Sequence, residues 1–410
     1  MGEERNLRDR KSIRVREREE RRTGPHRVEA LPRTAVEFEL RRAVSTHDFD
    51  VAPPHLLRVS GAERRDRRFL RGEASGKMNS RLATALALRD LPRREDPLDE
   101  TFALAPTHAD DAGDVRGIDA EADDGGYANM ILPLPDAAFE WRDTAFGPAL
   151  VCLPLEEDAP HLFTTRAWPL GQAGAHRRVW ADVAVALGAS MAELVRLQQV
   201  HRAGIVVADG LPRAAQDALP EADIVLARDA GRVIAVQAAD CVPLLIADRR
   251  LGVVAAAHAG WRGLAQGVPR VAIEAMVETY GSTPADLVVA TGPSVGACCY
   301  EVGPDVQVAF ATAGWPVDAL NRWFLPAPRV DAGNPPMPGL ASEPRPGHAF
   351  FDGWACAHEQ LRMAGVPAEQ LFSSRLCTAS HGVLCSYRRD GTVAGRIAGA
   401  IMPSSATGRL

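Results

Sequence analysis

A cysteine and a histidine stand at the two ends of one hairpin-like stretch, AADCVPLLIADRRLGVVAAAHAGWRG (residues 238–263). Its two apolar runs are separated by Arg249 and Arg250, which predicts antiparallel pairing across a two-residue turn. That pairing puts Cys241 opposite His258, with Cβ atoms roughly 5.5 Å apart. A three-residue turn would instead send the two side chains to opposite faces of the sheet. A lone cysteine beside an apolar run is more often a small core residue, so the case for chemistry depends on its polar neighbours.

A third candidate ligand, His201, follows the apolar run LVRLQQV (194–200) in the same strand-end position. One thiolate and two imidazoles suit zinc, and a fourth position open to water or substrate is typical of a catalytic site. His201, Cys241 and His258 are therefore the predicted metal ligands, with Zn²⁺ as the predicted cofactor. Copper is the less favoured metal. A multicopper oxidase also needs paired histidines, and the 11 histidines of this chain include no His-x-His pair.

Two other interpretations of the same residues stay open. A thiol beside an imidazole is also the arrangement of a cysteine hydrolase, in which Cys241 or Cys299 is the nucleophile and His258 is its base. A non-catalytic domain can use the hairpin as a structural zinc clip, which predicts a closed site and unfolding by a chelator. The metal content of the protein and the effect of removing the metal distinguish a catalytic zinc site, a cysteine hydrolase and a structural zinc clip.

Charged residues near these ligands indicate a substrate site. Asp240 directly precedes the thiol and is predicted to support a ligand imidazole or to carry a proton. Arg262 stands four residues after His258, and Arg166 ends the run HLFTTR. A guanidinium group binds phosphate through two hydrogen bonds. Asp240 and Arg262 are therefore the predicted catalytic residues, and Arg166 and Arg262 are the predicted phosphate-binding residues.

The segment GPSVGACCYEVGPDV (292–306) follows the apolar run LVVAT. A loop of glycine and serine exposes backbone N–H groups that bind an anion or a sugar hydroxyl. Ser294 and Cys299 are predicted to contact the substrate from this loop. Cys298 cannot readily form a disulfide with its neighbour Cys299. Cys377, further along the chain, is interpreted as mainly structural.

The bulk composition favours a small-molecule partner. The chain has 410 residues, 53 acidic and 47 basic, with a net charge of -6 and a pI near 6.0. This balance excludes the strongly basic surface of a nucleic-acid-binding protein. The seven cysteines are odd in number and irregularly spaced, which favours reduced thiols and a cytoplasmic location. No apolar run reaches the ~20 residues of a membrane span, so no membrane partner is expected.

The folded part is expected to begin near residue 131. Residues 1–130 carry basic and acidic tracts with few large apolar residues. We predict an N-terminal extension that is largely disordered, or that lies upstream of the true start. From 131 to 406, several β-like runs follow one another without an intervening helix. That order favours an α+β fold with mixed sheets covered by helices. Near the end, the dipeptide Asp390-Gly391 predicts a strand pair.

Five motifs, in order, resemble the YfiH-type family, long labelled polyphenol oxidases or laccase-domain proteins and now regarded as purine nucleoside phosphorylases. The resemblance covers roughly residues 132 to 404. The motifs are QQVH (198–201), ADCVPLLIAD (239–248), HAGWRGL (258–264), GPSVGACCYEVG (292–303) and CTASHGVLCSYRRDG (377–391).

The resemblance implies a four-layer αββα sandwich with mixed β-sheets, forming a phosphorylase domain over 131–406. The family's His, Cys and His zinc ligands fall on His201, Cys241 and His258. The implied reaction is phosphorolysis of adenosine, inosine, guanosine and S-methyl-5′-thioadenosine, with deamination of adenosine as a second activity. A copper-dependent polyphenol oxidase is the alternative. The chain departs from the family at AWPLGQAGAH (167–176), which bears on substrate binding more than on the metal site.

Overall fold

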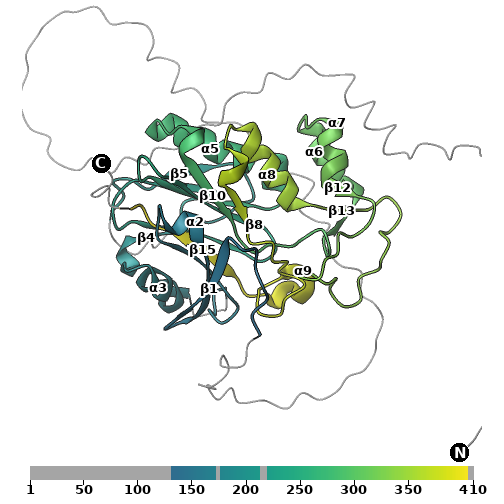
Figure 1. The fold of residues 1–410 in the computed structure, drawn as a ribbon, viewed down its shortest axis with the longest axis horizontal. Coiled ribbons are helices and arrows are strands. Elements are labelled where there is room, and N and C mark those ends of the chain that lie inside the picture. Colours follow the sequence, from purple (N-terminus) through teal and green to yellow (C-terminus); the bar gives the residue numbers. More distant parts are fainter. Residues whose placement is uncertain (1–130, 172–175, 213–218, 405–410) are drawn as a thin grey trace, which may run out of the picture. The chain divides into compact units, whose positions relative to one another are not determined.

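The structure is a computed structural model of the chain, and it describes residues 131–171, 176–212 and 219–404 (Figure 1). The described residues belong to one structural unit. The predictions made for residues 1–130 lie outside them, as do residues 172–175 of the AWPLGQAGAH segment. Within the described ranges, no helix combines the length and the apolar character needed to cross a membrane.

The first of two large sheets contains both ends of the described chain. Within the described residues it has six strands in the order β1-β2-β3-β15-β7-β4, and neighbours run antiparallel except for β4 and β7. Its strands are β1 (Phe139–Thr144), β2 (Gly147–Cys152), β3 (His161–Thr164), β4 (Leu194–Val195), β7 (Val233–Ala238) and β15 (Ile397–Ile401).

The second sheet contains the predicted hairpin at its centre. The described part of the chain gives it six strands in the order β14-β10-β8-β9-β6-β5, with parallel pairs at the two edges and antiparallel pairs between. Its strands are β5 (Ile205–Val207), β6 (Ile224–Ala227), β8 (Val242–Asp248), β9 (Val254–Ala259), β10 (Leu287–Thr291) and β14 (Leu371–Ser373).

Alternate residues of β8 show how the layers pack. Leu245 lies in a core shared with β2, β3 and β7 of the first sheet, so the two sheets face each other. Leu244 and Ile246 point the other way, toward helices α5 (Val268–Tyr280) and α8 (Gly353–Met363). Helix α3 (His176–Ala186) packs on the outer face of the first sheet. The predicted four-layer αββα sandwich of the α+β class is confirmed (Figure 1).

A small third sheet and shorter helices fill the connections. The third sheet has the order β11-β13-β12. The remaining elements are β11 (Glu301–Val302), β12 (Phe324–Leu325), β13 (Ala349–Phe351), α2 (Leu153–Glu156), α4 (Trp261–Ala265), α6 (Pro304–Thr312), α7 (Val317–Trp323) and α9 (Tyr387–Asp390), with single 3₁₀ turns at Met191–Glu193, Pro284–Asp286, Ala368–Gln370 and Gly391–Val393.

The strand pair predicted around Asp390 and Gly391 is wrong. Residues Tyr387–Asp390 form the helix α9 instead. Ser386 caps its first turn, because its Oγ accepts a hydrogen bond from the Arg389 N–H at 3.2 Å. The positive φ of Gly391, 61°, then ends the helix. The dipeptide Asp390-Gly391, which suits a hairpin turn, therefore ends a helix. The strand β15 that follows pairs with β3 and β7 and not with the segment just before it.

Candidate metal centre

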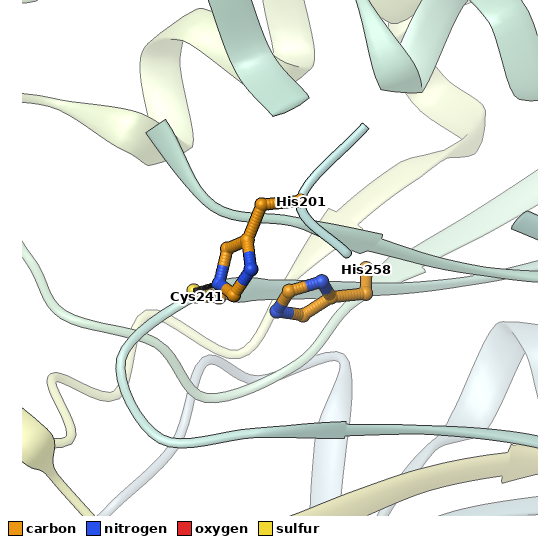
Figure 2. Close-up of side chains that lie close together, drawn as sticks. All are labelled: His201, Cys241 and His258. Atoms are coloured by element: carbon orange, nitrogen blue, oxygen red, sulfur yellow. Dashed lines mark hydrogen bonds between the residues drawn. The ribbon is translucent and has the colours of Figure 1, made fainter. Parts of the chain in front are cut away.

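The structure brings the three predicted metal ligands together, and their side chains point toward one another (Figure 2). The ligand atoms of His201, Cys241 and His258 all lie within 4.8 Å of one another. Sγ of Cys241 is 3.9 Å from Nε2 of His201, and the two imidazole rings stand edge to face with centroids 4.9 Å apart. His258 is buried, Cys241 is half-buried and His201 is exposed. The cluster is therefore open on the side of His201.

The β8–β9 hairpin presents Cys241 and His258 on one face, in a register that differs from the predicted one. Pro243 lies opposite His258, because the connection is the loop from Arg249 to Gly252. The predicted two-residue turn is wrong. The two registers differ by two residues, and a shift of two leaves each side chain on the same face of a strand. Cys241 and His258 are therefore diagonal neighbours, which still brings them together.

Gly260 has no side chain, and its absence makes room for the side chains of the ligands. It follows β9 and stands at the N-terminal end of α4. A Cβ atom at this position would lie 2.9 Å from Sγ of Cys241 and 3.0 Å from Cδ2 of His201. Both distances are shorter than van der Waals contact. A side chain here would push one ligand away from the others.

Asp223, which is not predicted from the sequence, holds two of the three ligands. It is fully buried at the start of β6. Its Oδ1 accepts a hydrogen bond from Nδ1–H of His258 at 2.8 Å, and the carboxylate also accepts from the backbone N–H groups of residues 200–202. Those contacts fix the loop of His201, whose φ is positive at 57°. A carboxylate behind a ligand imidazole sets the tautomer that leaves Nε2 free for a metal.

The buried polar groups shift one another's pKa values. Burial alone would raise the pKa of the Cys241 thiol, but the His258 and His201 imidazoles lower it to about 6. Burial would likewise lower the pKa of His258, but Cys241 and Asp223 raise it to about 9. Burial would also raise the pKa of the Asp223 carboxyl, and its bonds to His258 and the backbone keep it below its usual value. Cys241 is thus a thiolate near neutral pH, the form that binds a metal.

Asp240 does not contact the ligand imidazoles. Its carboxylate accepts a hydrogen bond from the Thr378 hydroxyl at 2.6 Å and another from the backbone N–H of Arg388. Its φ is 89°, and burial raises the pKa of its carboxyl. The hydrogen-bond support predicted for Asp240 is supplied by Asp223 instead. Asp240 ties the residue before Cys241 to the C-terminal motif.

The two predicted phosphate-binding arginines are exposed. Arg262 lies in α4, with its guanidinium 4.3 Å from the centre of the Trp261 ring. Arg166 follows β3 and forms an ion pair with Asp390. Neither guanidinium is buried, so both are accessible to an anion.

Tyr300, which is also not predicted from the sequence, interacts electrostatically with Cys241 and with Arg388 and Arg262. Burial raises the pKa of its phenol, the neighbouring Cys241 raises it further, and Arg388 and Arg262 oppose that rise. The Arg388 guanidinium lies 5.4 Å from the centre of its ring. The only sequence signal is its place in the GPSVGACCYEVG motif. The raised pKa favours the neutral form of the phenol.

Ser294 and Cys299, predicted to contact substrate, are fully buried. The Ser294 hydroxyl accepts a hydrogen bond from the Trp354 indole at 2.7 Å. Cys299 packs with Cys298 and Cys377 in a separate cluster of thiols. The structure therefore does not join Cys299 to the His201, Cys241 and His258 cluster, and the substrate-binding roles of Ser294 and Cys299 stay predictions.

Comparison with known proteins identifies a family and several similar proteins. A family described as multi-copper polyphenol oxidoreductase laccase matches residues 174–404. Purine nucleoside phosphorylase ORF3 of Streptomyces griseus is 37% identical over 213 residues, which span 52% of this chain and 75% of that protein. Adenosine deaminase RL5, from an unknown prokaryotic organism, is 32% identical over 220 residues, covering 52% of this chain and 76% of its own length.

A solved structure agrees with the fold. The crystal structure of YlmD from Geobacillus stearothermophilus superposes with a TM-score of 0.53 and 27% identity, covering 65% of this chain and 99% of YlmD. The family match includes all three candidate metal ligands and all five sequence motifs in full. The YfiH-type resemblance is thereby confirmed, and the chain belongs to the laccase-domain family described as multi-copper polyphenol oxidoreductase laccase.

Proposed function

We propose that this chain is a zinc-dependent purine nucleoside phosphorylase. It converts adenosine, inosine, guanosine or S-methyl-5′-thioadenosine, with phosphate, into the free base and the pentose 1-phosphate. The observation that carries the proposal is the cluster of His201, Cys241 and His258, open on one side, in a chain similar to a protein named purine nucleoside phosphorylase. The relative named adenosine deaminase supports deamination of adenosine as a second activity.

The donor set fits zinc. In a tetrahedral site with Zn–S near 2.3 Å and Zn–N near 2.0 Å, a sulfur and a nitrogen ligand lie about 3.5 Å apart. Sγ of Cys241 and Nε2 of His201 are 3.9 Å apart, and Nε2 of His258 is left for an ion by the contact of Nδ1 with Asp223. These three residues would hold the ion. A zinc ion with a free position supplies a Lewis acid that activates water or polarises a substrate atom.

The arginines are proposed to hold phosphate. In phosphorolysis a phosphate oxygen forms a bond to C1′ of the pentose, the C1′–N9 bond breaks, and the base leaves with a proton. Arg262 binds the phosphate from α4, and Arg166 binds it in exchange for its ion pair with Asp390. Asp240 is proposed to carry the proton, because burial keeps the pKa of its carboxyl above the usual value. Ser294 is proposed to contact the nucleoside. Cys299, predicted to do the same, packs instead with Cys298 and Cys377 and is not proposed to contact it.

The setting proposed for this activity is the cytoplasm. All the cysteines of the described residues are free thiols, as expected in a reducing compartment. The expected partners are the nucleoside and phosphate alone, with neither nucleic acid nor membrane as a partner.

Metal analysis combined with a phosphate-dependent assay on inosine and adenosine tests the proposal. We expect stoichiometric zinc and release of ribose 1-phosphate. His201→Ala and Cys241→Ala should each lower kcat/KM by more than about 100-fold, since a lost ligand weakens metal binding at least as much as lost support. Cys356→Ser, a buried thiol in α8, is the matched control and should keep activity. Copper together with phenol oxidation, or full activity in both ligand variants, would contradict the proposal.

A cysteine hydrolase is the second candidate, and the low pKa of Cys241 beside His258 favours it. It predicts activity in the metal-free protein that alkylation of Cys241 abolishes. Activity that is lost on chelation and restored by zinc argues against it. A structural zinc clip differs from both, because chelation would then unfold the domain.

A further inference from the structure

A second group of candidate metal ligands lies apart from the first. The Sγ atoms of Cys298, Cys299 and Cys377 lie within 4.8 Å of one another. Cys298 and Cys299 belong to the loop between β10 and β11, and Cys377 follows β14 on a distant part of the chain. All three side chains are at most 1% exposed. These three residues are called the thiol cluster below.

Two sulfurs of the thiol cluster receive hydrogen bonds from the backbone. The Gly296 N–H donates to Sγ of Cys377 at 3.2 Å, and the Met337 N–H donates to Sγ of Cys299, also at 3.2 Å. A neutral thiol is a weak acceptor, whereas hydrogen bonds to sulfur are a regular feature of metal-bound thiolates. The backbone thus favours negative charge on these sulfurs. A buried cluster tolerates that charge when a cation is bound.

Ser380 offers an oxygen beside the sulfurs. Its Oγ lies 3.5 Å from Sγ of Cys298 and 3.5 Å from Sγ of Cys299. Its hydroxyl hydrogen is directed at the Pro335 carbonyl oxygen, 2.5 Å away, which leaves its lone pairs for the cluster. Three sulfurs and one oxygen supply the four ligands of a closed tetrahedral site.

The spacing fits a metal ion better than a disulfide. Sγ of Cys298 and Sγ of Cys299 are 3.4 Å apart, whereas a disulfide bond is about 2.0 Å long and adjacent cysteines form it only with strain. A bond from either of them to Cys377 would leave one buried thiol without a partner. Sulfurs that share a tetrahedral zinc ion lie about 3.8 Å apart. That value falls between the 3.4 Å separation and the 4.8 Å limit of the thiol cluster.

We propose that the thiol cluster binds a second zinc ion, with Oγ of Ser380 as the fourth ligand. Thiolates select zinc over hard cations such as magnesium or calcium. The site is structural, because its four ligands leave no position for water. A cavity of about 200 Å³ lies beside the thiol cluster and is lined in part by Cys298, Asn334 and His358.

The second ion would fasten the two loops beside the first cluster. Cys377 is followed by Thr378, whose hydroxyl donates to the Asp240 carboxylate at 2.6 Å. The Asp240 carbonyl accepts from the N–H of Val295, in the same loop as Cys298, at 3.0 Å. Both loops therefore meet at the residue that precedes Cys241. A metal in the thiol cluster holds that ligand in place without touching substrate.

Zinc analysis of the full chain, purified under reducing conditions, tests this proposal. We expect two zinc ions per wild-type chain. The His201→Ala/Cys241→Ala variant should keep one, and the Cys298→Ser/Cys377→Ser variant should also keep one. Replacement of zinc by Co²⁺ tells the two sites apart. Since the thiolate-to-cobalt charge-transfer absorption grows with the number of thiolates, it should be about three times as strong per cobalt in the first variant as in the second.

The Cys356→Ser variant removes a buried thiol outside both clusters and should keep two ions. One zinc ion in the wild type and none in His201→Ala/Cys241→Ala would overturn the proposal. So would a disulfide between two of these three cysteines in protein purified without reductant, found by peptide mapping as a mass about 2 Da below that of the reduced peptides. If Cys298→Ser/Cys377→Ser fails to fold, the zinc content of the wild type and that of His201→Ala/Cys241→Ala still decide whether the second site exists. Neither count depends on phosphorylase activity.

Discussion

Replacement of Asp223 by asparagine perturbs the polar side chain that supports the candidate centre. The carboxylate is fully buried, and asparagine keeps its shape while it replaces one acceptor oxygen with an NH₂ group. Each oxygen now serves two donors, so two donors lose their acceptor whichever oxygen is replaced. The four donors are Nδ1–H of His258 and the N–H groups of Val200, His201 and Arg202.

The magnitude follows from how these donors are divided. Oδ1 serves His201 and His258, and Oδ2 serves Val200 and Arg202. A buried donor without a partner costs about 1 to 3 kcal/mol, so the loss of two acceptors should lower the free energy of unfolding of the metal-free protein by about 2 to 6 kcal/mol. Lost support for a ligand imidazole weakens metal binding by roughly 10- to 100-fold, or about 1.4 to 2.7 kcal/mol.

Zinc affinity is measured by competition with a chromophoric chelator, and stability by urea unfolding. Asp248→Asn is the matched control, because Asp248 is equally buried on the same hairpin and its Oδ1 accepts from the N–H groups of Arg250 and Leu251. Both donors use Oδ1 and the buried Oδ2 has no partner, so asparagine can keep both hydrogen bonds. This variant should therefore leave the zinc affinity unchanged and lower stability less than Asp223→Asn does. Wild-type zinc affinity in Asp223→Asn, or an equal loss in both variants, would refute the role given to Asp223.

Three further substitutions give measurable outcomes. Gly260→Ala puts a methyl carbon 2.9 Å from Sγ of Cys241, so zinc affinity in chelator competition should fall by about tenfold or more. Burial lowers the pKa of His161 to about 4 from its ordinary 6.5. The unfolded chain therefore takes up this proton at higher pH than the folded protein. Stability is lost as the pH falls from 6.5 to 4, by at most about 3 kcal/mol, and urea unfolding of His161→Gln should lack that loss. Gly292→Ala puts a carbon 2.3 Å from the Phe163 ring and should lower the free energy of unfolding by about 2 kcal/mol.

Gly382→Ala is the control for both glycine substitutions, because an added Cβ there meets no atom within 4 Å. It should change neither zinc affinity nor stability. Unchanged zinc affinity in Gly260→Ala would show that the ligands move aside freely. Equal pH dependence in the wild type and His161→Gln would show that His161 titrates normally.

The sequence predicted which two ligand residues the hairpin brings together more reliably than it predicted the turn of the hairpin. The two-residue turn at Arg249 and Arg250 was wrong, yet Cys241 and His258 still share a face because the register error was an even number of residues. Strand periodicity decides the face, whereas the loop conformation decides the register. His201 was found by its position after an apolar run, and the positive φ that turns it toward the others could not be read from that run.

Asp223 could not be found by the same reasoning. The only signal is a carboxylate at the head of the apolar run ADIVLAR, where a strand-end aspartate is usually exposed. Its role arises because β6 pairs with β9, which places Ile224 opposite Ala257 and brings Asp223 beside His258. The misplaced C-terminal hairpin has in part a similar cause, since the ion pair of Asp390 with Arg166 is a tertiary feature, whereas the Ser386 cap of α9 is local.

The three candidate ligands are held with unequal firmness. Cys241 and His258 stand at one end of two hydrogen-bonded strands in the middle of a sheet. His201 stands on an exposed loop that Asp223 holds through the His201 backbone N–H. Rotation of the His201 side chain disturbs no strand. We expect this asymmetry to set the order in which a bound ion would leave: the bond to His201 would open first, and the hairpin ligands would release the ion afterwards. The rate of metal exchange would then depend on one surface side chain.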